Sequence, residues 1–154
     1  MAASARRTAY HEAGHAAGCL MSGLRFESVT SVPAGRYAGC VSLPSGAQSH
    51  GDGDFVVVMA GGIIADRLSR GRGDFTINTI RNWHQYGWLE TDILKLTGAF
   101  PGKRRLLALV EGAVGLMRAY WPAVEAIAHA LIEPTTLSYD DAQALLVGAL
   151  KEVH

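Results

Sequence analysis

The sequence predicts a mainly α-helical domain with a small β-sheet, which places it in the α+β class. Apolar residues recur at spacings of three and four over most of the chain, as they do along one face of a helix. Two short segments in the first third carry the β-branched residues and turn signals of strands. No internal repeat, low-complexity tract or linker interrupts the chain, and 154 residues suit a single hydrophobic core. We therefore expect one domain over residues 1–154.

The first elements are a helix and a strand pair. Ala5–Leu20 is rich in alanine, Ser4 can cap its N-terminus, and Gly23 stands where glycine commonly ends a helix. Glu27–Val32 and Tyr37–Leu43 are strand candidates, and the sequence Pro-Ala-Gly-Arg between them supplies a turn. Together they predict a hairpin or a small mixed sheet.

The second long helix is expected at Phe55–Leu68, with Asp54 as its cap. It is apolar almost all round and should be buried. Gly61 and Gly62 lower its intrinsic stability, so we expect close packing against another helix in compensation. The remaining predicted helices are Ile77–Tyr86, Thr91–Ala99, a long one from Lys103 that Pro122 kinks or restarts, and a final one opened by Asp140 and Asp141.

Composition argues against binding to nucleic acid or lipid and against a membrane segment. Fourteen basic and 14 acidic residues give a formal net charge of zero, which disfavours binding to nucleic acid or to anionic lipid. The longest uncharged apolar run, Phe55–Ala65, is far shorter than the roughly 20 residues of a membrane helix, so no membrane segment is expected. Cys19 and Cys40 do not form a disulfide framework, which favours a reducing compartment such as the cytoplasm.

The strongest functional signal is the sequence HEAGH at residues 11–15, an H-E-x-x-H motif on the first predicted helix. A spacing of four places His11 and His15 about one turn apart on one face, where both can bind one metal ion. Glu12 lies beside them and is a candidate general base for hydrolysis by a zinc-activated water. The bare motif is equally compatible with two ordinary polar histidines, and a catalytic site needs a third protein ligand.

A wider similarity favours the metal interpretation. The sequence TAYHEAGHA at residues 8–16 closely resembles the zinc-binding helix of the FtsH family of ATP-dependent metalloproteases. The family commonly has an acidic pair where this chain has Asp66 and Arg67. Further similarities follow in order: Val29-Thr30, Pro33, Gly35-Arg36, Gly39, Leu43-Pro44, Ala60-Gly61-Gly62, Ile64 to Arg67, and Leu131 to Leu137, which resembles the family's closing helices. The resemblance implies a zinc endopeptidase domain, with His11 and His15 as ligands.

The resemblance also implies an aspartate as third ligand, at the start of a helix well downstream. Asp92, in the sequence TDILKLT, has the following aliphatic residue and the later threonine of the family arrangement. Asp74 is the alternative, but β-branched residues follow it and suit a helix less well. We favour Asp92 because metal ligands need rigid helical support. Two histidines and a carboxylate also suit iron, cobalt or manganese.

The second predicted strand has a functional interpretation as well. In the FtsH family an edge strand beside the zinc pairs with extended substrate through main-chain hydrogen bonds. The alternative is an ordinary sheet edge that the fold protects in another way. The residues expected to bind substrate in this way are Tyr37, Ala38, Gly39, Cys40 and Val41.

ATP-driven unfolding is not expected of this chain alone, because the sequence contains no G-x-x-x-x-G-K-[ST] phosphate loop. The expected substrates are therefore peptides and unfolded or exposed polypeptide, and a separate ATPase or adaptor is a candidate partner. The alternative function is an inactive, FtsH-peptidase-like binding or regulatory module. The intact glutamate of the motif favours the enzyme.

Overall fold

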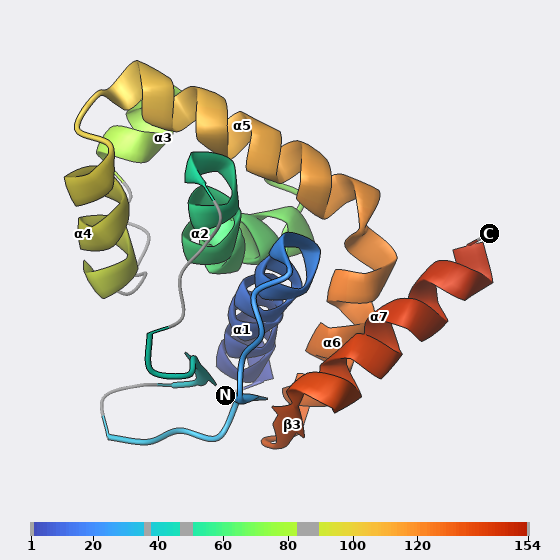
Figure 1. Ribbon diagram of the computed structural model, residues 1–154. Coiled ribbons are helices and arrows are strands. Elements are labelled where there is room, and N and C mark those ends of the chain that lie inside the picture. Colours follow the sequence, from blue (N-terminus) through green and yellow to red (C-terminus); the bar gives the residue numbers. More distant parts are fainter. Residues whose placement is uncertain (1, 36–37, 47–50, 83–89, 154) are drawn as a thin grey trace.

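The computed structural model describes residues 2–35, 38–46, 51–82 and 90–153 (Figure 1). Its helices are α1 (Ala2–Ser22), α2 (Asp52–Ser69), α3 (Ile77–Arg81), α4 (Glu90–Ala99), α5 (Lys103–Ala119), α6 (Trp121–Ile132) and α7 (Tyr139–Val153). Its strands are β1 (Ser28–Thr30), β2 (Cys40–Ser42) and β3 (Thr136–Ser138). The described chain is mainly helical with one small antiparallel sheet, which confirms the α+β class.

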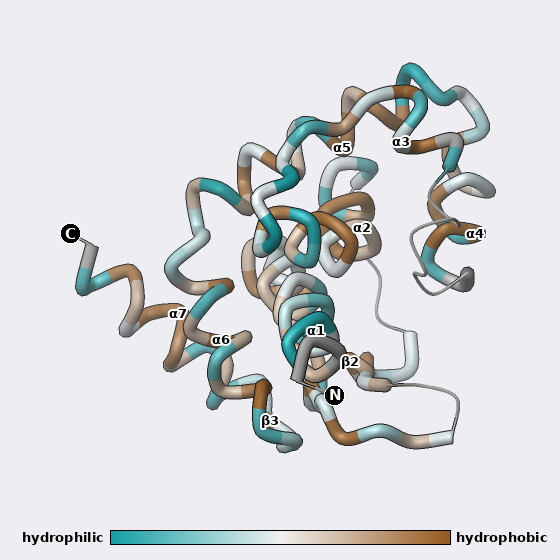
Figure 2. Tube along the Cα trace, turned by 180° about the vertical axis from the view of Figure 1, so that it is seen from behind, coloured by the Kyte–Doolittle hydropathy of each residue, from teal (hydrophilic) through white to brown (hydrophobic). Residues whose placement is uncertain are grey.

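Helix α1 lies at the centre of the fold, with α2 packed on one side and α6 on the other (Figure 1). Helix α5 crosses α2, and α7 packs against α6. Figure 2 shows that α2 is hydrophobic through its central turns, and the buried side chains of this helix extend from Val56 to Arg67. The expected burial of this helix is confirmed. Among the described residues, no helix is long and apolar enough to cross a membrane.

Glycines allow α1 and α2 to approach closely. A Cβ atom on Gly14 would lie 2.0 Å from the carbonyl oxygen of Gly61, and one on Gly61 would lie 2.5 Å from that of Gly14. One turn further along α1, a Cβ on Gly18 would lie 2.5 Å from the carbonyl oxygen of Val57. Backbone packs directly on backbone at this crossing, so the close packing expected of Gly61 is confirmed.

An ion-pair cluster joins the same two helices. Asp66 on α2 is almost fully buried and accepts hydrogen bonds from Arg7 of α1 (3.1 Å) and Arg70 (3.0 Å). A buried carboxylate requires such partners, because an unpaired charge in the interior is costly. The cluster therefore helps to fix α1, which carries the HEAGH motif, against α2.

Gly23 ends α1 as the sequence predicts. Its φ of 70° lies in the left-handed region that favours glycine. The N–H of Leu24 donates to the carbonyl oxygen of Cys19 at 2.9 Å, and the N–H of Gly23 donates to the carbonyl oxygen of Leu20 at 3.4 Å. This is the Schellman arrangement, which satisfies carbonyl groups that the helix end leaves open.

Two expected N-caps are wrong. Ser4 lies inside α1, because the helix begins at Ala2. Asp54 lies in the first turn of α2, and Gly51 occupies the N-cap position without a side-chain cap bond. An acidic residue stabilises the first turn of a helix through the helix dipole without being the N-cap itself. Asp54 therefore indicated the N-terminal end of α2 correctly but not the N-cap residue.

The sheet has the order β2-β1-β3, with both pairs antiparallel. The expected hairpin is confirmed, but β1 and β2 are three residues each and shorter than predicted. The expectation of closing helices over Leu131 to Leu137 is wrong, because α6 ends at Ile132 and β3 follows at Thr136. Glu133 is already extended because Pro134 follows it and disfavours helical backbone, and the chain then pairs with β1.

The later helices follow the predicted breaks. Helix α5 begins directly after Pro101 and Gly102, and α6 restarts with Pro122 in its first turn. Helix α3 ends at Arg81 with Asn82 as its C-cap, so it is shorter than predicted. Residues 83–86 of the predicted helix lie outside the described residues. Helix α7 begins one residue before Asp140.

Candidate metal centre

Helices α1 and α4 bring three potential metal ligands together. The Nε2 atoms of His11 and His15 are 3.1 Å apart, and Asp92 Oδ2 lies 3.1 Å from His15 Nε2 and 3.4 Å from His11 Nε2. The histidines share one face of α1, as their spacing predicts. Asp92 lies in the first described turn of α4, 77 residues beyond His15 in the sequence. Only the tertiary structure could place it there.

The donor set fits a zinc ion. Tetrahedral zinc with ligand distances of about 2.0–2.1 Å separates neighbouring ligand atoms by roughly 3.3–3.4 Å, close to the spacings of these three atoms. Two imidazoles and one carboxylate are also a common catalytic zinc set, which leaves one position open. His11, His15 and Asp92 are each only 11–13% exposed at the side chain, so the site is well shielded from water.

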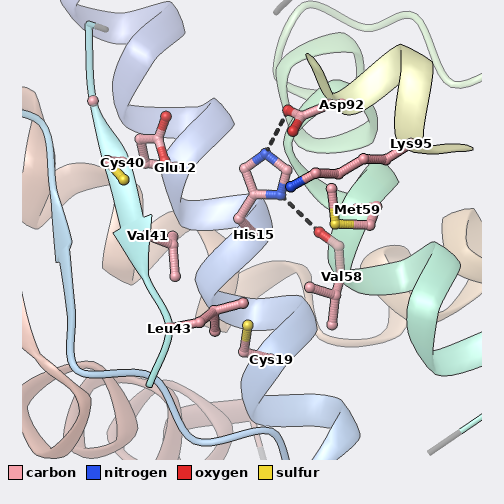
Figure 3. Close-up of a pocket in the computed structure, with 11 residues that line it drawn as sticks. Glu12, His15, Cys19, Cys40, Val41, Leu43, Val58, Met59, Asp92 and Lys95 are labelled. Carbon is pink, nitrogen blue, oxygen red and sulfur yellow. Dashed lines mark hydrogen bonds and ion pairs between the residues drawn. The ribbon is translucent and has the colours of Figure 1, made fainter. Parts of the chain in front are cut away.

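The backbone of α2 orients His15. Its Nδ1–H donates a hydrogen bond of 2.7 Å to the carbonyl oxygen of Val58, which directs the Nε2 atom at the donor cluster. Figure 3 shows the ring held between Val58 and Asp92. An outer partner of this kind fixes the tautomer and ring orientation of a metal-binding histidine.

Gly62 leaves the space in which the donors meet. A Cβ atom at this position would lie 2.6 Å from His15 Nε2 and 2.8 Å from His11 Nε2. Gly61 and Gly62 therefore have different roles, although both stand in the same turn of α2. Gly61 contacts the backbone of α1, and Gly62 lies directly against the imidazole nitrogens of the donor cluster.

The electrostatics favour a positive charge between the three groups. Burial raises the pKa of Asp92, but hydrogen bonds from His11 and His15 outweigh it and hold that pKa well below its ordinary value. Burial lowers the pKa of His15, yet the hydrogen bond and charge of Asp92 raise it to about 9. The aspartate is therefore ionised and His15 carries the matching positive charge at neutral pH, so a metal ion that binds Nε2 would displace its proton.

Glu12 lies beside the donors and is almost fully buried. Burial raises the pKa of its carboxyl, and the nearby His15 and His11 partly offset this shift. A Cβ atom on Gly39 would lie 2.7 Å from Glu12 Cγ, so the absence of a side chain at Gly39 lets the segment before β2 pass directly over the glutamate. A buried carboxyl whose pKa is raised is a candidate for proton transfer.

A cavity of about 260 Å³ lies between α1, α2, α4 and β2 (Figure 3). Glu12, His15 and Asp92 supply its polar wall. The rest of its lining is Cys19, Gly39, Cys40, Val41, Leu43, Val58, Met59 and Lys95. The cavity is thus polar at the donor cluster and mainly apolar beside it, which is the usual character of a binding site.

The predicted substrate strand lies at this cavity. Gly39, Cys40 and Val41 line it, and Ala38 is exposed next to them. Tyr37 lies outside the described residues. Strand β2 pairs with β1 on one side only and is the last strand of the sheet, so it presents an open edge among the described elements.

Asp74 lies away from the donor cluster. Its side chain is 88% exposed, and its nearest charged partner is Arg67, at 3.9 Å. Its carbonyl oxygen accepts a hydrogen bond from the same arginine. Of the two aspartates that the sequence offers as third ligand, the structure brings Asp92 to the histidines and leaves Asp74 in solvent.

Sequence reasoning missed three contributors to this site, namely Val58, Gly62 and Lys95. Val58 acts through its backbone carbonyl, which no residue type signals. Gly62 was expected only to aid helix packing. Lys95 stands three residues after Asp92, so the helical period could have placed it on the same face once Asp92 was chosen.

The two cysteines should differ sharply in reactivity. Cys40 is exposed on β2, whereas Cys19 is buried and burial raises the pKa of its thiol to about 12. Because the thiolate is the reactive form, iodoacetamide at neutral pH should modify Cys40 and spare Cys19 until denaturant unfolds the chain. Peptide mass spectrometry would measure both sites. Equal modification of Cys19 in the folded and unfolded protein would contradict the described burial.

A scan against protein-family models found no model that matches this chain, and a search of curated proteins found no matching protein.

Proposed function

We propose that this protein is a zinc-dependent endopeptidase of the FtsH-peptidase type, which hydrolyses peptide bonds in unfolded or exposed polypeptide. The observation that carries the proposal is the convergence of two histidine nitrogens and one aspartate oxygen, 3.1–3.4 Å apart, beside a buried glutamate. The H-E-x-x-H motif supplies three of the four residues. The cavity and the open strand edge beside them support a polypeptide substrate.

Each residue has a distinct role in this proposal. His11, His15 and Asp92 would hold the zinc ion, and Val58 orients His15 through the Nδ1 hydrogen bond. Zinc in such a set lowers the pKa of bound water and polarises a carbonyl group. Glu12 accepts the proton of the attacking water and then delivers it to the departing amine, a task suited to a buried carboxyl of raised pKa.

Strand β2 would align the substrate. An extended peptide can add to its open edge through main-chain hydrogen bonds, which are tolerant of sequence. The apolar part of the cavity then faces a substrate side chain near the reacting bond. Folded proteins offer few extended segments to an edge strand, so peptides and unfolded chains are the expected substrates.

Residues 1–154 carry no phosphate-binding loop, so coupling to ATP would use an ATPase outside these residues. A separate ATPase or adaptor could deliver unfolded substrate to the cavity. The two described cysteines are free thiols, so the cytoplasm remains the expected compartment.

The deciding experiment combines metal analysis with cleavage of fluorescein-labelled casein, an unfolded protein, by purified material. Wild type should hold about one zinc per chain and cut casein, and a chelator should stop the reaction. Glu12→Gln should keep the zinc and lose activity by roughly 10²- to 10⁴-fold, because the general base is gone. Asp92→Ala should lose the zinc, and Asp74→Ala is the matched control that should keep both zinc and activity.

Two results would overturn the proposal. Absence of zinc after reconstitution would show that the cluster is not a metal site. Zinc binding without cleavage of casein or of short peptides would instead favour the binding or regulatory module.

A further inference from the structure

The cavity contains one cationic side chain for which the proposed mechanism has no use. Lys95 lies one turn after Asp92 on α4 and lines the same cavity (Figure 3). It is exposed, and among the described residues that line the cavity it is the only lysine or arginine. An exposed lysine is usually an ordinary solvated surface residue. A functional role for Lys95 must therefore be argued from the groups around it.

Lys95 has no carboxylate partner within the described part of the chain, unlike the ion-paired arginines. Lys103 and Lys151 have none there either, so the position of Lys95 in the cavity is what sets it apart. Arg7 and Arg70 pair with Asp66, Arg25 with Asp140, and Arg105 with Asp52. The closest acidic neighbour on its own helix face is Asp92, which interacts instead with the two histidines. The ammonium group of Lys95 is therefore available to a ligand.

If zinc were bound, the charges of the site would leave the positive charge of Lys95 without a balancing negative charge. Glu12 and Asp92 carry two negative charges when ionised, and a zinc ion would carry two positive charges. These balance, and Lys95 adds one positive charge to the same cavity. A partly enclosed, low-dielectric cavity strengthens an electrostatic interaction relative to open water.

The position of Lys95 fits a substrate contact. Strand β2 and Lys95 both line the cavity, and Glu12 and His15 line it with them. A peptide aligned on β2 at the catalytic residues would therefore pass within the cavity that holds the ammonium group.

We propose that Lys95 is a specificity-determining residue that binds a carboxylate of the substrate close to the reacting bond. This inference rests on the proposed peptidase function. The carboxylate has two chemical sources, an acidic side chain or the free C-terminus of a short peptide. Lys95 acts as a point charge and favours either, since its three donors are not confined to one planar geometry.

The test uses quenched peptides that differ at one position only, with Glu or Gln scanned through the three residues on each side of the cleaved bond. Each is made with a free and with an amidated C-terminus. Wild type should cut the best Glu peptide about tenfold more efficiently than its Gln partner, as for a hydrogen bond to a charged group. Amidation distinguishes the two sources, because it removes only the C-terminal carboxylate.

Three variants sharpen the comparison. Lys95→Met should bring the ratio of kcat/KM for Glu over Gln close to one, and Lys95→Glu should invert the preference toward a Lys-containing peptide. Lys151→Met is the matched control on α7 and should keep the wild-type ratio. Raised salt should reduce the ratio in wild type and in Lys151→Met but not in Lys95→Met, because screening weakens the charge pair.

Failure of this inference is distinguishable from failure of the peptidase proposal. If Gln peptides are cut but Glu and amidation change nothing, or if Lys95→Glu keeps the wild-type preference, Lys95 has no role in specificity. If no peptide is cut by the zinc-loaded protein, the peptidase function itself fails, and the inference fails with it.

Discussion

Gly62→Ala is expected to abolish tight zinc binding while the helical fold is retained. The added methyl group would lie 2.6 Å from His15 Nε2 and 2.8 Å from His11 Nε2, in the space where the donor atoms meet. His15 cannot simply rotate away, because its Nδ1–H is held by the carbonyl oxygen of Val58. We expect zinc affinity to fall at least about 100-fold, the upper range for changes in the shell around metal ligands.

Competition with a chromophoric chelator would measure this affinity, and far-ultraviolet circular dichroism would report helix content. Gly112→Ala is the matched control, since Gly112 is exposed in α5 and a Cβ there meets no atom within 4 Å. The control should bind zinc normally and be slightly more stable, because alanine favours a helix over glycine by about 1 kcal/mol. Wild-type zinc affinity in Gly62→Ala would show that the donors do not meet over this glycine.

Gly14→Ala is expected to destabilise the whole fold. Its Cβ would lie 2.0 Å from the carbonyl oxygen of Gly61 and 2.7 Å from Ala65 Cβ, where α1 and α2 cross. The first obstacle is backbone, so the helices must separate and lose contacts along the crossing. Overpacking of this kind commonly costs about 1–3 kcal/mol and sometimes more, and we expect the upper end here.

Urea unfolding followed by circular dichroism would measure the effect. A loss of about 3 kcal/mol is a large part of the 5–15 kcal/mol that stabilises a typical domain, and for a chain of this size it lowers Tm by roughly 6–12 °C. Gly112→Ala again serves as the control for the substitution itself. A Gly14→Ala variant as stable as wild type would contradict the described backbone contact.

Helix α1 illustrates what local sequence can predict. His11, Glu12 and His15 are arranged by the period of one helix, so their spacing was sufficient to place two imidazoles on one face. The glycine that ends α1 and the proline that restarts α6 act through backbone geometry, which is also local. These features were predictable because neighbouring residues determine them.

Long-range pairing was less predictable. Strand β3 pairs with β1, which is more than a hundred residues away in the sequence. Within Leu131–Leu137, Pro134 indicates that the helix ends, but no residue indicates the strand with which the chain then pairs. The two N-caps were predicted wrongly for a different reason. Ser, Asp and Gly are all acceptable at helix starts, so composition locates a helix end only to within a few residues.

From the sequence alone we predicted the helix that carries the motif, two candidate metal ligands, a candidate general base and two alternative aspartates for the third ligand. The tertiary structure brings Asp92 to 3.1 Å from His15 Nε2 and leaves Asp74 exposed to solvent. It also revealed the carbonyl of Val58 and the space over Gly62. The physical reason is that a metal site is formed by groups from separate segments, and their distances depend on how helices pack rather than on the residues that neighbour them in sequence.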